Sequence, residues 1–280
     1  MSIFNSLIRL LSVFFLTCFS FSLALASDFH SPRTEALGGA GHAGSLLSDA
    51  IYLNPAAGSY IKSHSLSVNY QADSGNGHIF NASVLDGTEE SLFQAGLSYT
   101  SRVDANLIHV GASKSILSKM GIGIGGKFIF PNDNSGQRVG DATFSAIGIF
   151  AKWFQASLVI DNIMETASGR GFLREYIIGT KINVDQIILV YIDPHYVPSL
   201  QNGQNQFGIE AGIEFPFFTD VFLRMGTFTS SMIPYQNQRG DGYGIGLGWL
   251  APKISLDYSF SRVIGPTSSL AHTFGMTIYF

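Results

Sequence analysis

Apolar and polar residues alternate with a period of two along most of the chain after residue 63. The clearest stretches lie at 93–100, 207–215, 243–249 and 254–261. In the last of them Ile254, Leu256, Tyr258 and Phe260 alternate with serines and an aspartate. Alternation of this kind indicates strands with one apolar face. The chain is therefore predicted to be an all-β protein.

About fourteen strands are predicted from this pattern and from the turn residues between its stretches. An even number agrees with the rule for bacterial outer-membrane barrels. The predicted strands lie near 64–72, 78–86, 91–100, 106–114, 120–130, 142–152, 154–162, 175–183, 186–193, 206–215, 220–228, 242–250, 253–261 and 271–280.

Connections between the predicted strands alternate in length from the fifth strand onward. The short ones lie at 152–154, 183–186, 215–219 and 251–252, and the long ones at 131–141, 162–174, 194–205, 229–241 and 262–269. Transmembrane barrels have short periplasmic turns and longer extracellular loops. This parity predicts that both termini lie in the periplasm.

The first 26 residues have the features of a secretory signal peptide. Arg9 precedes an apolar run at 10–23, and Ala24-Leu25-Ala26 forms a cleavage site. A membrane anchor is the alternative, which the polar interruptions and the cleavage site disfavour. Cys18, the only cysteine, falls in this segment, so the mature chain is expected to have neither a disulfide nor a thiolate metal ligand.

Composition explains what the alternating strands face. The chain is 46% hydrophobic and 13% charged, yet no apolar run after residue 26 approaches the roughly 18 residues of a spanning helix. Only helices and closed barrels satisfy their backbone groups in lipid. We therefore predict an integral outer-membrane barrel of a Gram-negative-type bacterium, an antiparallel up-and-down barrel in contact with membrane lipid. The net charge of −4 gives no basic surface for nucleic acid.

The predicted last strand, 271–280, alternates from His272 to Phe280. Such an ending resembles the signal that the barrel assembly machinery recognises, so this machinery is an expected partner. The predicted organisation is then a signal peptide at 1–26, a separate N-terminal segment at 27–63 and the barrel at 64–280.

Residues 27–63 do not alternate. They contain a glycine-rich stretch around Gly38, Gly39 and Gly41, then Asp49, and finally Asn54-Pro55-Ala56. These features, in this order, resemble the N-terminal hatch of the FadL/TodX outer-membrane transport family. The stretches 158–162 with 176–179, and 254–260 with 272–274, resemble its shorter PorV-like branch. The resemblance implies fourteen strands and a hatch in the lumen; a periplasmic tail is the alternative.

Charged residues at predicted lumen-facing positions form a further candidate group. Lys or Arg on the lipid face at mid-depth costs about 2–4 kcal/mol, which favours an inward orientation. They could form a polar path or a latch for the hatch, or simply pair with one another. The group comprises Lys127, Lys181, Glu210, Glu214, Arg224 and Asp257.

The predicted outer loops are unusually apolar. Such clusters often mark ligand or partner sites, so they are candidates for the entry of a hydrophobic solute, or else they pack on each other as a lid. The residues are Met164, Phe172, Leu173, Tyr196, Val197, Met232, Ile233 and Tyr235.

Motifs for enzyme chemistry are weak. Residues 121–126 match G-x-G-x-x-G, but they lie within an alternating strand and no helix follows, so nucleotide binding is not expected. The seven histidines show no metal spacing, and we expect neither a cofactor nor a catalytic site. The leading hypothesis is passive uptake of hydrophobic solutes such as long-chain fatty acids. The alternative is a non-transporting, PorV-like barrel that docks secreted or surface proteins.

Overall fold

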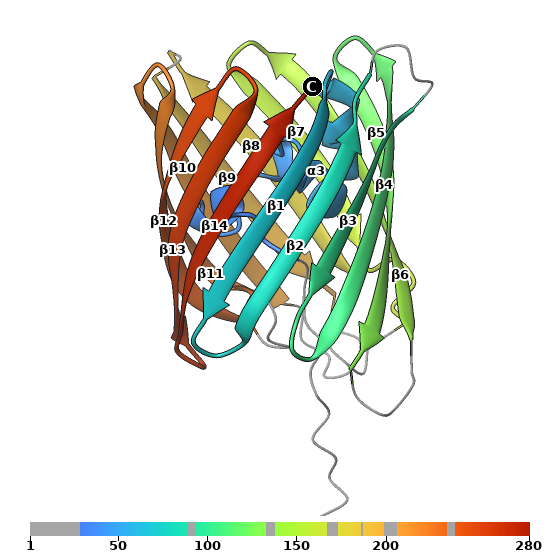
Figure 1. Cartoon of the computed structure of the whole chain (residues 1–280). Helices are drawn as coiled ribbons and strands as arrows, with labels where there is room; N and C mark the ends of the chain where they lie inside the picture. The colour runs from blue at the N-terminus through green and yellow to red at the C-terminus, as the bar shows by residue number, and fades with distance from the viewer. Residues whose placement is uncertain are drawn as a thin grey trace, which may run out of the picture.

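The computed structural model describes residues 29–88, 93–132, 138–166, 173–185, 187–198, 206–233 and 239–280. The described strands form one closed antiparallel barrel in which each strand pairs with its neighbours in sequence (Figure 1). The predicted signal peptide, 1–26, lies outside the described residues.

All fourteen predicted strands are confirmed. Their bounds are β1 His64–Asp73, β2 Gly77–Asp86, β3 Gln94–Ser101, β4 Ala105–Leu117, β5 Met120–Pro131, β6 Val139–Ala151, β7 Phe154–Asp161, β8 Glu175–Val184, β9 Ile188–Val197, β10 Gln206–Phe218, β11 Val221–Met232, β12 Arg239–Ala251, β13 Ile254–Gly265 and β14 Ser269–Tyr279. The barrel closes where β1 pairs with β14, with Leu66 opposite Ile278.

The alternation sorts side chains between the two surfaces of the barrel. Large apolar residues such as Ile245 (50% exposed) and Leu256 (44%) lie on the outside, whereas Ser98 and Ser259 are fully buried on the inside. Apolar outside and polar inside is the inverse of a soluble protein and fits a barrel in lipid. The protein is therefore an integral outer-membrane barrel.

One end of the barrel carries short turns and the chain end at Phe280. From β4 onward the connections at this end are 118–119, 152–153, 185–187, 219–220 and 252–253. The opposite end carries 132–138, 162–174, 198–205 and 233–238, although its last connection, 266–268, is also short. We call them the turn end and the loop end. By the rule for bacterial barrels, the turn end faces the periplasm.

Several strands continue beyond their predicted outer ends, which corrects part of the loop assignment. Tyr196 and Val197 belong to β9, and Met232 belongs to β11. The pairing continues here because inward-facing polar residues such as His195 and Ser231 prolong the alternation past the apolar belt.

Residues 29–63, here called the N-terminal segment, lie inside the barrel (Figure 1). The segment forms α2 Pro32–Ala36, η1 His42–Gly44, α3 Asp49–Tyr52 and η2 Pro55–Tyr60. No helix among the described residues is long and apolar enough to cross a membrane.

Candidate functional site

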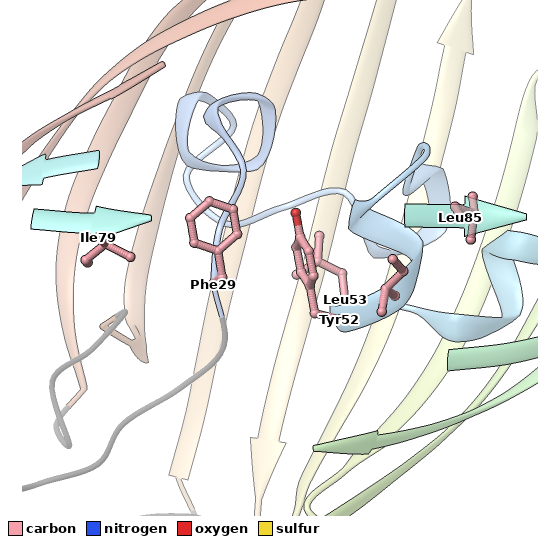
Figure 2. Packing of buried hydrophobic residues seen from close by; sticks show 6 residues of the cluster. Phe29, Tyr52, Leu53, Ile79 and Leu85 are labelled. Carbon is pink, nitrogen blue, oxygen red and sulfur yellow. The ribbon is translucent and has the colours of Figure 1, made fainter. Parts of the chain in front are cut away.

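Helix α3 and the first described residue of the N-terminal segment, Phe29, are anchored by apolar packing. Figure 2 shows Phe29, Tyr52 and Leu53 gathered with Ile79 and Leu85 of β2. The rings of Phe29 and Tyr52 meet edge to face, with centroids 5.7 Å apart. Such a pair contributes about 0.5–1.5 kcal/mol beyond its buried area. This cluster fixes α3 to the wall.

The Asn54-Pro55-Ala56 stretch builds the start of η2. The Asn54 side chain accepts a hydrogen bond from the Ala56 backbone N–H and donates one to the His42 carbonyl (2.6 Å). Pro55 occupies the first helical turn, where its missing N–H costs nothing. The Ala56 N–H also donates to Ser145 Oγ of β6 at 2.8 Å. The stretch therefore ties η2 both to η1 and to the wall.

Helix α2 lies against strands β11 to β14. Ser31 caps it, Pro32 begins it and Ala36 ends it. The turn that follows contains Gly38 and Gly39, whose φ angles of +67° and +92° favour glycine. A Cβ atom on Gly244 of β12 would lie 1.9 Å from the Glu35 carbonyl oxygen. Glycines in the wall thus allow the helix backbone to approach closely.

An ion-pair network joins α2 to the wall. Arg33 donates to Glu214 Oε2 at 3.1 Å and to Tyr191 Oη at 2.8 Å. Glu214 also accepts a hydrogen bond from Arg224 Nε at 2.6 Å, and Arg224 donates to Asp257 at 2.5 Å. Asp49 of α3 lies 3.9 Å from Arg33. Three of the predicted lumen charges therefore form a chain of ion pairs that connects through Glu214 to one buried arginine of the N-terminal segment.

Glu35 provides a second attachment of α2. Its carboxylate accepts hydrogen bonds from Thr273 at 2.5 Å, from Ser259 at 3.3 Å, and from Ser261 and Gln71, both at 3.2 Å. Glu35 belongs to the N-terminal segment and not to a membrane-spanning strand. Burial raises the pKa of Glu35 to about 7, against its ordinary value of 4.5.

A third attachment holds the turn around Gly41, another predicted hatch residue. Asp193 Oδ2 of β9 accepts hydrogen bonds from the Gly41 N–H at 2.7 Å and the His42 N–H at 2.9 Å. The same oxygen lies 2.9 Å from His42 Nδ1. One buried carboxylate therefore fixes both the backbone and the imidazole of η1.

The other predicted lumen charges also lie inside the barrel. Lys127 pairs with Asp161 of β7 at 2.7 Å, and the stem of Lys181 lies beside Gly44 of η1. Glu210 accepts a hydrogen bond from Ser231 at 2.5 Å and lies 3.2 Å from His195. The Lys127 pair links two strands, whereas Lys181 and Glu210 face the N-terminal segment.

Cavities lie on both sides of α2. One of about 130 Å³ opens toward the turn end; its lining includes Arg33, Leu47, Phe222, Trp249 and Ser255. Another of about 30 Å³ opens toward the loop end, where the apolar side chains of Phe228, Met232, Ile233 and Val263 line it together with Glu35. The helix and its attachments separate the two spaces.

The predicted apolar entry residues divide between several places. Ile233 and Val197 are buried, and Met232 and Ile233 line the cavity at the loop end. Tyr196 contacts Phe207, with ring centroids 5.0 Å apart. Met164 is 62% exposed, and Leu173 is half-buried. Phe172 and Tyr235 lie outside the described residues.

Together these features define an outer-membrane barrel whose lumen is occupied by its own N-terminal segment. No protein-family model matches the sequence, and no curated protein matches it. Solved structures do match the fold. The CymD monoaromatic hydrocarbon channel superposes with a TM-score of 0.70 at 10% identity, over 93% of this chain and 99% of that one.

Two further structures give similar figures. The toluene transporter TbuX of Ralstonia pickettii has a TM-score of 0.65 at 11% identity, with 93% of this chain and 100% of that one covered. A Pseudomonas aeruginosa FadL homologue has a TM-score of 0.63 at 10% identity, with 92% of this chain and 99% of that one covered. The resemblance to FadL/TodX barrels is thus confirmed for the fold. The PorV-like branch stays a prediction.

Sequence reasoning missed most of the polar residues that join the N-terminal segment to the wall. Arg33, Glu35, His42 and Asp193 are not in the candidate groups, although each lies at a contact between the N-terminal segment and the wall. Arg33 and Glu214 are 181 residues apart, so no local spacing links them. The available signal was a charge within an otherwise small and apolar N-terminal segment.

Proposed function

We propose that this barrel mediates passive uptake of small hydrophobic solutes across the outer membrane, with residues 27–63 acting as its hatch. The observation that carries the proposal is the pair of spaces on either side of α2. The helix between them is attached to the strands by ion pairs and hydrogen bonds. No covalent cross-link joins it to the strands among the described residues. A displacement of α2 would join the two spaces into a path.

Cavity size favours a compact solute. The space at the turn end, about 130 Å³, is close to the ~150 Å³ of an engineered protein cavity that takes up benzene. The space at the loop end, about 30 Å³, holds about one water molecule, so a solute enters only when the hatch moves. The fold similarity to proteins named as a monoaromatic hydrocarbon channel and a toluene transporter supports the same solute class. Long-chain fatty acids are the second class to test.

A single engineered cysteine tests the path. Cys18 lies in the predicted signal peptide, so Ser255→Cys would give the mature chain one thiol, in the cavity at the turn end. We expect a benzyl methanethiosulfonate label to reduce labelled-toluene uptake by cells or liposomes at least several-fold. The same protein before labelling is the reference, and Ser115→Cys, exposed near the turn end, is the matched control.

Uptake of labelled oleate in the same assay separates the two solute classes. Equal entry of both solutes with and without the protein would refute transport. A stoichiometric protein partner in the purified sample would then favour the PorV-like docking function.

A further inference from the structure

Two histidines that lie far apart in the sequence meet in the outer half of the lumen. His42 comes from η1 of the N-terminal segment, and His195 comes from β9. Their ring centroids lie 5.6 Å apart, with the planes at 80°. Glu210 of β10 completes the group: one possible ligand atom from each of the three residues lies within 4.8 Å of the others, and all three residues are buried.

Each imidazole is oriented by its own carboxylate. Asp193 Oδ2 lies 2.9 Å from His42 Nδ1, and Glu175 Oε1 lies 3.1 Å from His195 Nδ1. A proton on each Nδ1 would leave both Nε2 lone pairs available. Histidines that bind metals usually donate their other N–H to a carboxylate in this way. Both histidines therefore make the hydrogen bond to a carboxylate that usually orients a metal-binding imidazole.

The ligand atoms that face each other are within ion-pair distance, but their geometry is not that of a hydrogen bond. His195 Nε2 and Glu210 Oε2 are 3.2 Å apart, yet both are buried without a hydrogen-bond partner among the described residues. Ligands about 2.0–2.1 Å from a tetrahedral zinc ion lie about 3.3 Å from each other. The pair therefore has the spacing of two ligands of one ion. His42, whose ligand atom lies within 4.8 Å of the other two, would complete the set by moving toward them.

Charge and space also fit a divalent ion. Among the described residues, the carboxylates of Asp193, Glu175 and Glu210 pair with one guanidinium, that of Arg239, which donates to Glu175 at 2.8 Å, and with the two histidines. With neutral imidazoles, two negative charges stay uncompensated. A cavity of about 60 Å³ adjoins the group, with His30 also in its lining, and has room for about two waters as further ligands.

We propose that His42, His195 and Glu210 bind a divalent transition-metal ion that links the N-terminal segment to strands β9 and β10. Two imidazoles and one carboxylate suit Zn²⁺, Ni²⁺ or Cu²⁺ rather than Mg²⁺ or Ca²⁺, which prefer oxygen ligands alone. The ion holds η1 against the wall, next to the Asp193 contact. The site would exist whether or not the barrel transports solutes.

Zinc binding tests the site on the purified full-length barrel in detergent. After treatment with a chelator, equilibrium dialysis with elemental analysis should give one Zn²⁺ per chain. His42→Gln, His195→Gln and Glu210→Gln should each lower the affinity at least tenfold, and Asp193→Asn should lower it 10–100-fold through loss of the second contact. His109→Gln, at another buried lumen histidine, is the control and should bind as the wild type does.

Spectroscopy covers the case in which a variant fails to fold. With Cu²⁺ as the probe, the electron paramagnetic resonance spectrum of the wild-type barrel should show coupling to two nitrogens. Failure to bind stoichiometric Zn²⁺, binding unchanged in all three ligand variants, or a Cu²⁺ spectrum without nitrogen coupling would each overturn the proposal.

Discussion

The two halves of the N-terminal segment are held in the same lumen by different forces. Residues 49–60 are fixed mainly by packing, with Ile51, Tyr52 and Leu53 in one apolar cluster with β2 and one hydrogen bond from Ala56 to Ser145. Residues 32–42 are fixed mainly by buried polar groups, which are Arg33, Glu35 and the Gly41–His42 turn, beside a small apolar cluster of Leu37 and Ala40 with Tyr191. The second half of the segment leads directly into β1, whereas the first half borders both cavities.

This difference indicates which half can move. Apolar packing is insensitive to charge and pH and is lost only with the buried area itself. Buried ion pairs contribute little net stability when intact, but the loss of one partner is costly because a charge is left uncompensated. The polar half can therefore be released by changes at a few atoms, while the apolar half keeps the segment inside the barrel.

The largest effect is expected for Glu214→Gln, which removes the carboxylate between Arg33 and Arg224. The loss of one partner of a buried pair costs about 3–5 kcal/mol. Hydrogen exchange measured by mass spectrometry should show protection falling in residues 32–45 and staying unchanged in residues 49–60. Lys127→Gln is the matched control, because it breaks the buried Lys127–Asp161 pair within the wall; equal effects on residues 32–45 would contradict the prediction.

Ile51→Ala tests the apolar half. Ile51 is 3% exposed in the cluster with Phe29 and Leu85, and truncation of a buried isoleucine to alanine costs about 2–5 kcal/mol. Protection should now fall in residues 49–60 first. If residues 32–45 lost protection equally, the two halves would form one cooperative unit and the distinction between them would fail.

The two halves of the N-terminal segment also differ in how much of their structure could be predicted from the sequence. The strands could be predicted because alternation is local, and Asn54-Pro55-Ala56 was singled out because turn chemistry is local. The contacts of Arg33 and Glu35 could not, because their partners lie on distant strands that only barrel closure brings near. The outer ends of β9 and β11 were missed because Pro194 on β9, and Thr229 with Ser230 on β11, interrupt the apolar alternation of the outward face.

Substitution of a glycine in the wall should have a smaller effect, which again depends on the half of the N-terminal segment that it faces. Gly244→Ala would place a methyl group 1.9 Å from the Glu35 carbonyl oxygen, so α2 must shift; overpacking of this kind costs about 1–3 kcal/mol. Gly111→Ala is matched, because its methyl group would meet Ile51 of the other half at an ordinary 3.5 Å. Thermal unfolding should show a lower Tm for the first variant only, and a similar decrease in both would refute the close approach.

The smallest effect is expected from Glu35→Gln, and it should depend on pH. Burial raises the pKa of Glu35 above its ordinary value of 4.5, to about 7. The folded state then favours the protonated acid. The stability that Glu35 contributes to the folded state is therefore complete below pH 4.5 and is lost as the pH rises through 7. Protection of residues 32–45 should decrease from pH 5 to pH 8 in the wild type.

Glutamine keeps the shape of the protonated acid but does not ionise. The free energy of opening residues 32–45 should therefore differ between the variant and the wild type by less than about 1 kcal/mol at pH 5, the scale of one hydrogen bond. The protection of these residues should also change less between pH 5 and pH 8 in the variant. Residues 49–60, held by apolar contacts, are the internal control in both proteins. A wild-type profile as flat as that of the variant would show that Glu35 stays in one protonation state, and that pH does not govern how the polar half is held.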